Sequence, residues 1–286
     1  MTPAIQRRTV AVDGLRLHVA EAGAGPALLL IHGLTASHAV WQPTIAEFAG
    51  DWRVIAPDLP GHGESDKPDA PYTIDFFAGV TRSLLRELDV HEAVVAGSSL
   101  GGQVALELAA WYPASTRALV LAAPAVGYSA AMRPVGQALQ LLTAGPKLLR
   151  ARLTQAVQQS FHDRSRIGHV TRRRILEERL AADDLPAFAR AVAKSLGGVL
   201  TAEPQPLHRV TQPVFLLWGR EDRLVPLRRS ERLLRRLPQA RLHVLERCGH
   251  LPMLEQPTAF NRAMRGFLRI ALADPYPFDR HGDGVH

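Results

Sequence analysis

The stretch AVVAGSSLGGQVALELAAW, residues 93–111, decides the fold expected for this chain. A short apolar run over residues 93–96 leads into the pattern Gly-x-Ser-x-Gly, formed by Gly97, Ser99 and Gly101, and a helix-forming segment follows at once. A strand, an abrupt turn and a helix in this order are the setting in which this motif presents a nucleophilic serine. The segment therefore predicts a strand–turn–helix unit of an α/β fold, with Ser99 at the turn.

The two glycines of the motif have a steric purpose. Gly97 and Gly101 carry no side chain, so the strand and the helix can approach closely around Ser99, whose backbone the turn forces into a strained conformation. The hydroxyl of Ser99 is then held above the sheet at a positive helix N-terminus, and the amide of Leu100 is free to donate to an oxyanion. The alternative is that these small residues only pack a strand against a helix.

A second serine–glycine cluster, SLGG at residues 195–198, lacks this setting. Ala193 stands where the first glycine of the motif should be, and the surrounding residues follow helical rather than strand periodicity. We therefore interpret residues 195–198 as part of a helix without a nucleophile.

Length and composition favour one large α/β domain with room for an inserted subdomain. The chain has 286 residues, 47% of them hydrophobic, which is enough for a sizeable core. Its lone cysteine, Cys248, excludes an intrachain disulfide, and it is interpreted as a small packed side chain rather than a nucleophile. Residues 1–14 contain no apolar segment of the secretory type, and no apolar run is long enough to cross a membrane. We expect a cytoplasmic protein without a membrane span.

The basic charge of the chain does not by itself indicate nucleic-acid binding. The net charge is +7 and the isoelectric point is about 10.3, but only three of the 34 basic residues are lysines. The arginines alternate with Leu and Glu at helical spacing over residues 172–179 and 228–236, as on solvated helix faces. Because no aromatic-basic pattern or nucleic-acid motif accompanies them, no nucleic-acid partner is expected.

The order of predicted elements is that of an α/β protein. Residues 7–22 alternate around the turn signal Asp13-Gly14 and predict a hairpin. Several unbroken apolar runs follow, and such runs indicate parallel strands that are buried on both faces. The predicted strands cover residues 27–31, 54–56, 93–96, 118–122, 213–218 and 241–245, with helices over 74–88 and about 100–112.

Between residues 125 and 206 the strand rhythm stops and helical periodicity takes over, interrupted by prolines. We expect a core domain formed by residues 1–124 and 207–273, a helical cap over 125–206 inserted after the sixth strand, and a disordered tail over 274–286. Apolar cap residues could line a pocket for substrate or could only pack the cap on the core. These candidates are Tyr128, Leu139, Leu142, Leu149 and Phe161.

A serine nucleophile needs a base and a group that orients the base. Each should follow a strand at the carboxyl edge of the sheet. The loop after the strand at 213–218 contains Glu221 and Asp222, and the loop after the last strand contains His250. The chain order Ser99, Asp222, His250 is the order expected for a nucleophile elbow on such a sheet. We prefer Asp222 to Glu221 as the orienting acid, although adjacent residues can be separated only by geometry.

Two further histidines, His32 and His62, lie in glycine-bounded turns, and we expect them to support loop structure. His32 and Gly33 end the strand at 27–31. Gly33 lets the backbone turn so that the amide of Leu34 can face the reacting carbonyl beside the amide of Leu100. Leu34 and Leu100 are therefore the predicted oxyanion-hole donors, with His32 as a possible support.

Together these segments make the chain similar to the α/β-hydrolase superfamily, in particular to its cap-bearing serine esterases. The resemblance covers roughly residues 7–270 and is carried by HG at 32–33, DLPGHGESD at 58–66, GSSLGG at 97–102, WGREDRLVP at 218–226 and CGH at 248–250. It implies a mostly parallel eight-stranded sheet with helices on both faces and a helical cap over the site. A serine at the elbow, where the haloalkane dehalogenase and epoxide hydrolase branches carry aspartate, argues against those branches.

The resulting expectation is a serine hydrolase that cleaves a small, apolar carboxylic ester through an acyl-enzyme. One alternative is hydrolysis of a C–C bond in a vinylogous diketone. Related enzymes of that kind usually carry Trp after the histidine, where this chain has Leu251. Thioesterase, lactonase, perhydrolase and acyltransferase reactions use the same triad, and a binding protein with negligible turnover is the non-enzyme alternative. No metal or cofactor is expected, because the sequence has no metal-ligand pair, phosphate loop or dinucleotide fingerprint. The oligomeric state does not follow from the sequence.

Overall fold

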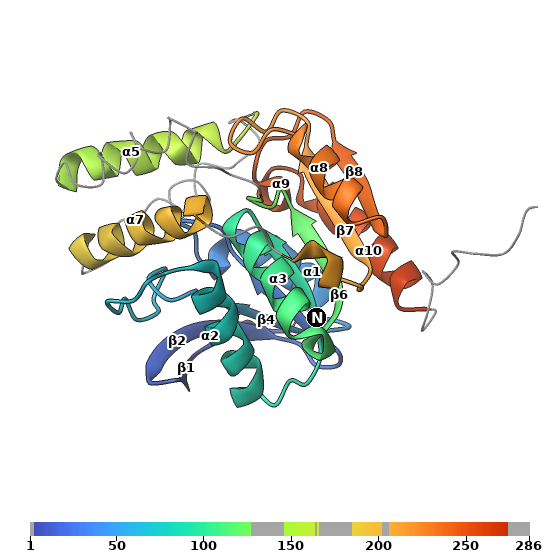
Figure 1. Cartoon of the computed structure of the whole chain (residues 1–286), viewed down its shortest axis with the longest axis horizontal. Coiled ribbons are helices and arrows are strands. Elements are labelled where there is room, and N and C mark those ends of the chain that lie inside the picture. The colour runs from blue at the N-terminus through green and yellow to red at the C-terminus, as the bar shows by residue number, and fades with distance from the viewer. Residues whose placement is uncertain (1–2, 127–145, 164, 166–184, 202–205, 274–286) are drawn as a thin grey trace, which may run out of the picture.

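The computed structural model describes residues 3–126, 146–163, 165, 185–201 and 206–273 (Figure 1). Strands and helices alternate along this part of the chain. In order they are β1 (Gln6–Val12), β2 (Leu15–Ala22), β3 (Ala27–Ile31), η1 (His38–Trp41), α1 (Gln42–Phe48), β4 (Arg53–Pro57), α2 (Ile74–Glu87), β5 (Ala93–Ser98), α3 (Leu100–Trp111), η2 (Pro113–Ser115), β6 (Thr116–Ala122), α5 (Pro146–Gln159), α7 (Leu185–Thr201), η4 (Leu207–Arg209), β7 (Val214–Gly219), α8 (Arg229–Arg236), β8 (Ala240–Leu245), α9 (Pro252–Glu255) and α10 (Pro257–Ala271).

The strands form one eight-stranded sheet in the order β1-β2-β4-β3-β5-β6-β7-β8. The hairpin β1–β2 and its pairing with β4 are antiparallel, whereas the pairs from β4 through β8 are parallel. The expected mostly parallel eight-stranded α/β-hydrolase sheet is confirmed. Because the parallel strands all run the same way, the loops after β3, β5, β7 and β8 meet at one edge.

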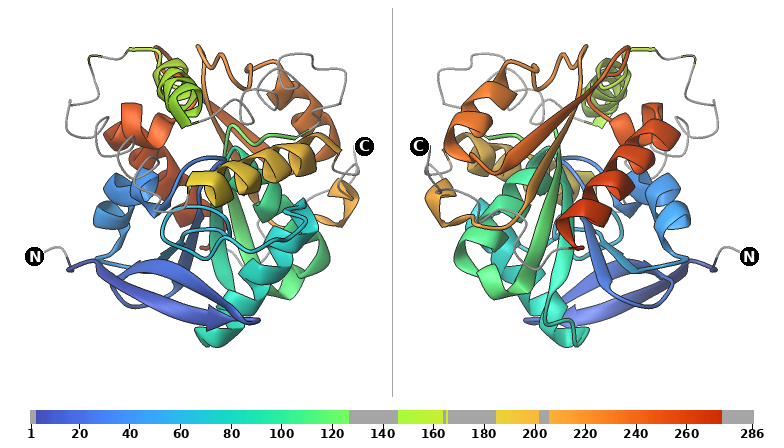
Figure 2. Two further views of the ribbon diagram at one scale, coloured as in Figure 1. Left: turned by 90° about the vertical axis from the view of Figure 1, so that its left-hand side faces the viewer. Right: turned by 90° about the vertical axis from the view of Figure 1, so that its right-hand side faces the viewer.

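Helices cover both faces of the sheet, as Figure 2 shows from two sides. Alternate residues of β3 divide between two hydrophobic clusters: Leu29 and Ile31 join the side chains of α2 and α3, while Leu28 and Leu30 join those of α1 and α10. This two-sided burial explains why the parallel strands read as unbroken apolar runs in the sequence.

The helices α5 and α7 lie between β6 and β7 in the chain and outside the layered core (Figures 1 and 2). This position corresponds to the predicted helical cap, whose limits stay a prediction. The SLGG segment lies inside α7, where the Ser195 hydroxyl is buried and donates to the Ala191 carbonyl. The hydrogen bond is an ordinary one within a helix, which agrees with our interpretation of this segment.

Of the candidates for the cap pocket, Phe161 follows α5 and is buried in the cluster that contains Leu251 and Met253. Its packing role is therefore the better supported one. Tyr128, Leu139, Leu142, the side chain of Leu149 and the predicted tail over 274–286 lie outside the described residues. Among the helices that the structure describes, none has the length and apolar character needed to span a bilayer.

Candidate active site

Ser99 occupies a strained turn between β5 and α3. Its φ is 54° and its ψ is −115°, a combination that non-glycine residues rarely adopt and that costs about 1–3 kcal/mol. The surrounding backbone maintains this strain, since the Ser99 amide donates to the Ala122 carbonyl of β6 at 3.0 Å. The Ser99 carbonyl accepts from the amides of Gly102, Gln103 and Ala125. The turn therefore has the local geometry predicted for a nucleophile elbow.

The glycines of the motif are required by space. A Cβ atom on Gly97 would lie 2.2 Å from the Gly101 carbonyl oxygen, and one on Gly101 would lie 2.2 Å from the Ile31 carbonyl oxygen. Neither glycine has positive φ, so the close approach of backbone segments, not the dihedral angle, excludes a side chain at both positions. The helix α3 can start directly beneath the serine only because these atoms are missing.

The oxyanion side of the site lies beside the serine. A Cβ atom on Gly33 would be 3.1 Å from the Ser99 Cβ, so the turn after β3 touches the elbow directly. The next residue is Leu34, and Thr35 then adopts a positive φ of 61°. The amides of Leu34 and Leu100 have no hydrogen-bond acceptor among the residues that the structure describes. Both are therefore available to a ligand, as the oxyanion-hole prediction requires.

His32 ties the turn after β3 to the loop after β4. The Leu59 amide donates to His32 Nε2 at 2.9 Å, so Nδ1 carries the proton and donates to the Gly33 carbonyl at 2.8 Å. His62, whose ring centroid is 5.3 Å from that of His32, uses Nδ1 for the Pro60 carbonyl. Burial, with a smaller effect from His32, lowers the pKa of His62 to about 3, so its ring is neutral at physiological pH. Both rings support loop structure here.

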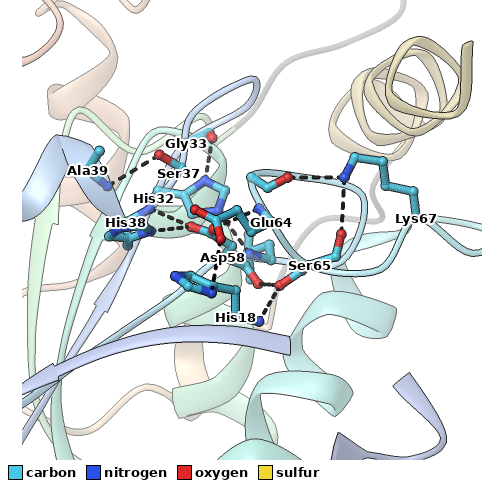
Figure 3. Close-up of polar contacts among 12 residues, drawn as sticks. His18, His32, Gly33, Ser37, His38, Ala39, Asp58, Glu64, Ser65 and Lys67 are labelled. Carbon is cyan, nitrogen blue, oxygen red and sulfur yellow. Dashed lines mark hydrogen bonds and ion pairs between the residues drawn. The ribbon is translucent and has the colours of Figure 1, made fainter. Parts of the chain in front are cut away.

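Asp58 is the polar centre of this loop system (Figure 3). Its Oδ1 accepts from the His38 amide at 2.6 Å and faces His38 Nδ1 at 2.9 Å, while Oδ2 accepts from the Glu64 amide. Burial alone would raise the pKa of Asp58, but the hydrogen bond with His38 and the Glu64 amide outweigh it and lower this pKa. Asp58 thus fastens η1 to the loop over residues 58–66. Sequence reasoning missed this role, because nothing in the local pattern marks the contact with His38.

His18, His38 and Asp58 also offer three potential metal-ligand atoms within 4.8 Å of one another. Both oxygens of Asp58 already accept hydrogen bonds that hold the loops. His38 Nδ1 is engaged by the same carboxylate. These contacts show that the cluster holds the surrounding loops together.

On the other side of the site, Asp222 contacts His250. Asp222 Oδ2 lies 2.7 Å from His250 Nδ1, and the carboxylate is completely buried, with the His250 ring only 7% exposed. The remaining oxygen, Oδ1, accepts from the amides of Leu224 and Val225 at 2.8 Å each. This pair has the arrangement that holds an imidazole in one tautomer and stabilises its cation.

Glu221 does not contact the imidazole. It points instead to the backbone of the loop after β8, where its Oε2 accepts from the Cys248 amide at 2.9 Å. The side chain of Cys248 is completely buried and packs in the core. Of the two adjacent acids, the structure therefore brings Asp222 to His250, as preferred on the sequence. Glu221 and a third carboxylate, that of Glu255, hold the loop that carries His250.

Comparison with known proteins agrees with this fold. Residues 26–257 match the family model described as alpha/beta hydrolase fold. A 2-hydroxy-6-oxononadienedioate/2-hydroxy-6-oxononatrienedioate hydrolase of Burkholderia vietnamiensis is 32% identical over 284 residues, which span 91% of this chain and 94% of that protein. The structure of a membrane phospholipase A, described as a bacterial virulence factor, superimposes with a TM-score of 0.81 and 27% identity, covering 94% of this chain and 87% of the other. A meta-cleavage product hydrolase from Pseudomonas fluorescens superimposes with a TM-score of 0.78 and 25% identity, covering 93% and 98%.

The chain belongs to the α/β-hydrolase family. It is a hydrolase. The names of similar proteins differ in the bond that they cleave, since one is a phospholipase A and others are meta-cleavage product hydrolases.

Proposed function

We propose that this protein is a serine hydrolase that cleaves carboxylic esters through an acyl-enzyme, with Ser99, His250 and Asp222 as its triad. The observation that carries the proposal is the 2.7 Å contact between the buried Asp222 carboxylate and His250 Nδ1, after two strands that end at the same sheet edge as Ser99. A buried carboxylate, an oriented imidazole and a strained serine in this chain order serve nucleophilic catalysis.

The reaction would begin when Ser99 Oγ attacks the acyl carbon and His250 Nε2 takes its proton. The negative charge that develops on the carbonyl oxygen would be stabilised by the amides of Leu34 and Leu100. His250 would then give the proton to the departing alcohol, which leaves the acyl group on Ser99. In the second half, His250 would take a proton from water as the water attacks the acyl-enzyme, and the acid would leave as Ser99 regains its proton. Asp222 would stabilise the imidazolium in both halves.

The test compares the wild type with Ser99→Ala on p-nitrophenyl esters of short and medium acyl chains. Ser98→Ala is the matched control, because it removes the hydroxyl of the neighbouring residue, which is fully buried in β5. We expect Ser99→Ala to lose activity and Ser98→Ala to keep most of it. Wild-type activity in Ser99→Ala would contradict the proposal, and a stoichiometric burst of p-nitrophenol without turnover would indicate the binding-protein alternative.

Hydrolysis of a C–C bond is the second candidate, and the names of the similar hydrolases favour it. The same triad and oxyanion donors would serve a vinylogous diketone, whose released product is a dienoate. Leu251, the residue after His250, packs into the core together with Phe161 and Met253. Comparing kcat/KM for a 2-hydroxy-6-oxo-dienoate with that for the best p-nitrophenyl ester decides between the two. A higher value for the dienoate would replace the ester proposal.

A further inference from the structure

The loop that carries His250 is fastened by three consecutive backbone amides, each to a different part of the molecule. The Cys248 amide donates to Glu221 Oε2 in the loop after β7, at 2.9 Å. The Gly249 amide donates to Glu255 Oε2 in α9, at 2.8 Å. The His250 amide donates to the Ser160 carbonyl at the end of α5, at 2.7 Å. The backbone of the histidine is thus held from three directions.

Glu255 also binds the chain that follows α5. Its Oε1 accepts from the Asp163 amide at 2.7 Å, and its Oε2 accepts from the His162 amide at 3.2 Å in addition to Gly249. Glu255 is only 4% exposed, and no ion pair with a cation is found for it among the described residues. Three backbone N–H groups from two segments, 86 or more residues apart along the chain, therefore satisfy one buried carboxylate.

Gly249 shows how closely the two segments fit. A Cβ atom at this position would lie 2.6 Å from the Ser160 carbonyl oxygen, 2.7 Å from the His162 nitrogen and 3.0 Å from the Phe161 carbonyl carbon. The side chain of Phe161 is buried in the same cluster as Leu251. The segment Ser160–Asp163, which we call the α5 end, is therefore packed against the backbone of Gly249, and its Phe161 shares an apolar cluster with Leu251 on the other side of the histidine.

We propose that Glu255 is a positioning residue for His250, and that it makes the α5 end part of the support of the catalytic histidine. This inference rests on the proposed serine hydrolase function. Since the α5 end belongs to the predicted cap, displacement of the cap at this point would move the imidazole relative to Ser99. A shift of about 1 Å in a catalytic group can cost about a hundredfold in rate. Glu255 acts through the backbone of residues 249–250 and does not touch the reacting atoms.

The test uses a fluorophosphonate probe, which reports the reactivity of a base-activated serine without depending on ester specificity. In Glu255→Ala all three amides lose their acceptor. In Glu255→Gln the side-chain oxygen can replace only one of the two carboxylate oxygens. The side-chain NH₂ group then takes the place of the other oxygen and cannot accept from the backbone N–H that faces it. We expect the inactivation rate at saturating probe to fall about a hundredfold in Glu255→Ala and about tenfold in Glu255→Gln. The probe concentration for half-maximal rate should change by no more than about twofold.

Asn261→Ala is the matched control for a loss of stability. Asn261 is a buried polar residue of the neighbouring helix α10, where it is hydrogen-bonded to Thr44 and Pro43 and is remote in sequence from the histidine loop. We expect this variant to lose thermal stability while keeping the wild-type labelling rate. If Glu255→Ala does not fold, Glu255→Gln and Gly249→Ala are used instead. In Gly249→Ala the added Cβ atom would force the histidine loop away from the α5 end.

The outcomes separate the two proposals. If the wild type is not labelled, the serine hydrolase proposal is wrong and the role of Glu255 falls with it. If the wild type is labelled and folded Glu255 variants are labelled at the same rate, the serine hydrolase proposal stands and the positioning role is wrong. A fall in rate that Asn261→Ala reproduces at equal stability would also overturn the positioning role.

Discussion

On the serine side of the candidate site, the structure depends on missing side chains, whereas on the histidine side it depends on buried carboxylates. Ser99 is held by backbone segments that pack so closely at Gly97 and Gly101 that no Cβ atom would fit at either position. His250 is held by three carboxylates. Asp222 accepts a hydrogen bond from its ring, while Glu221 and Glu255 accept hydrogen bonds from the two backbone amides that precede it.

This difference follows from where the two sides come from in the chain. The elbow joins β5 directly to α3, and the backbones of the neighbouring strands β3 and β6 close around it, so close backbone packing and backbone hydrogen bonds define it. The histidine loop contacts the loop after β7 and the α5 end, which are distant in sequence, as well as the adjacent helix α9. Side-chain carboxylates accept three of the hydrogen bonds that hold it. We therefore expect the serine side to fail by steric conflict and the histidine side by loss of an acceptor.

The largest effect should come from removing the proposed nucleophile or the proposed base. We expect Ser99→Ala and His250→Ala each to lower kcat/KM for an ester by about 10⁴-fold or more, and the double variant to lose little beyond either single one. The physical reason is that, in the proposed mechanism, Ser99 and His250 act as one unit. Losses that add across the double variant would show that the two residues work independently.

The next largest effect tests the acid that orients the histidine. We expect Asp222→Asn to lower kcat by about 10³- to 10⁴-fold, because the neutral amide no longer stabilises the imidazolium or enforces its tautomer. Glu221→Gln is the matched control, since its contact is with the Cys248 amide and one oxygen acceptor remains. Equal losses in both variants, measured as kcat at saturating ester, would mean that the 2.7 Å contact has no special role.

A smaller effect, on folding, probes the serine side. A Cβ atom on Gly101 would lie 2.2 Å from the Ile31 carbonyl oxygen, so we expect Gly101→Ala to lower the free energy of unfolding by about 3 kcal/mol. Gly79 in α2 has no atom within 4 Å of such a Cβ, and Gly79→Ala should instead stabilise the protein by about 0.5–1 kcal/mol. Urea unfolding measures both, and a tolerated Gly101→Ala would remove the steric account of the elbow.

The smallest predicted effect is a pH dependence of stability from His62. Burial lowers its pKa from 6.5 to about 3 in the folded protein, so between these values the unfolded chain binds the proton and the folded one does not. Its contribution is complete above pH 6.5 and is lost as the pH falls, by roughly 2 kcal/mol between pH 7 and pH 5. In His62→Leu, the fall in unfolding free energy between pH 7 and pH 5 should be smaller than in the wild type by that amount.

His91→Asn is the control for that measurement, because the His91 side chain is 95% exposed. Its slope with pH should match that of the wild type. An unchanged slope in His62→Leu would contradict the assignment of a neutral, buried ring beside His32. The depressed pKa of Asp58 does not interfere, because a carboxylate of this kind loses its contribution only at lower pH.

Much of the fold could be predicted because the signals for it are local. The apolar run at 27–31 coincides with β3, and the predicted helix over 74–88 ends one residue beyond α2. The resemblance implied a mostly parallel eight-stranded sheet, but the strand order β4-β3-β5 and the antiparallel placement of β2 beside β4 were not predicted, since periodicity does not specify partners. Residues 274–286 and the cap limits stay predictions.

The sequence by itself determined the strand–turn–helix unit at Ser99 and the order in which the serine, acid and histidine follow one another, because glycine spacing and apolar runs act over a few neighbouring residues. Only the tertiary structure decided that Asp222 faces the imidazole while Glu221 turns to the Cys248 amide. It also joined Glu255 to Gly249 and to the α5 end. Side-chain direction in a loop depends on how distant strands and helices pack around it, and no local pattern carries that information.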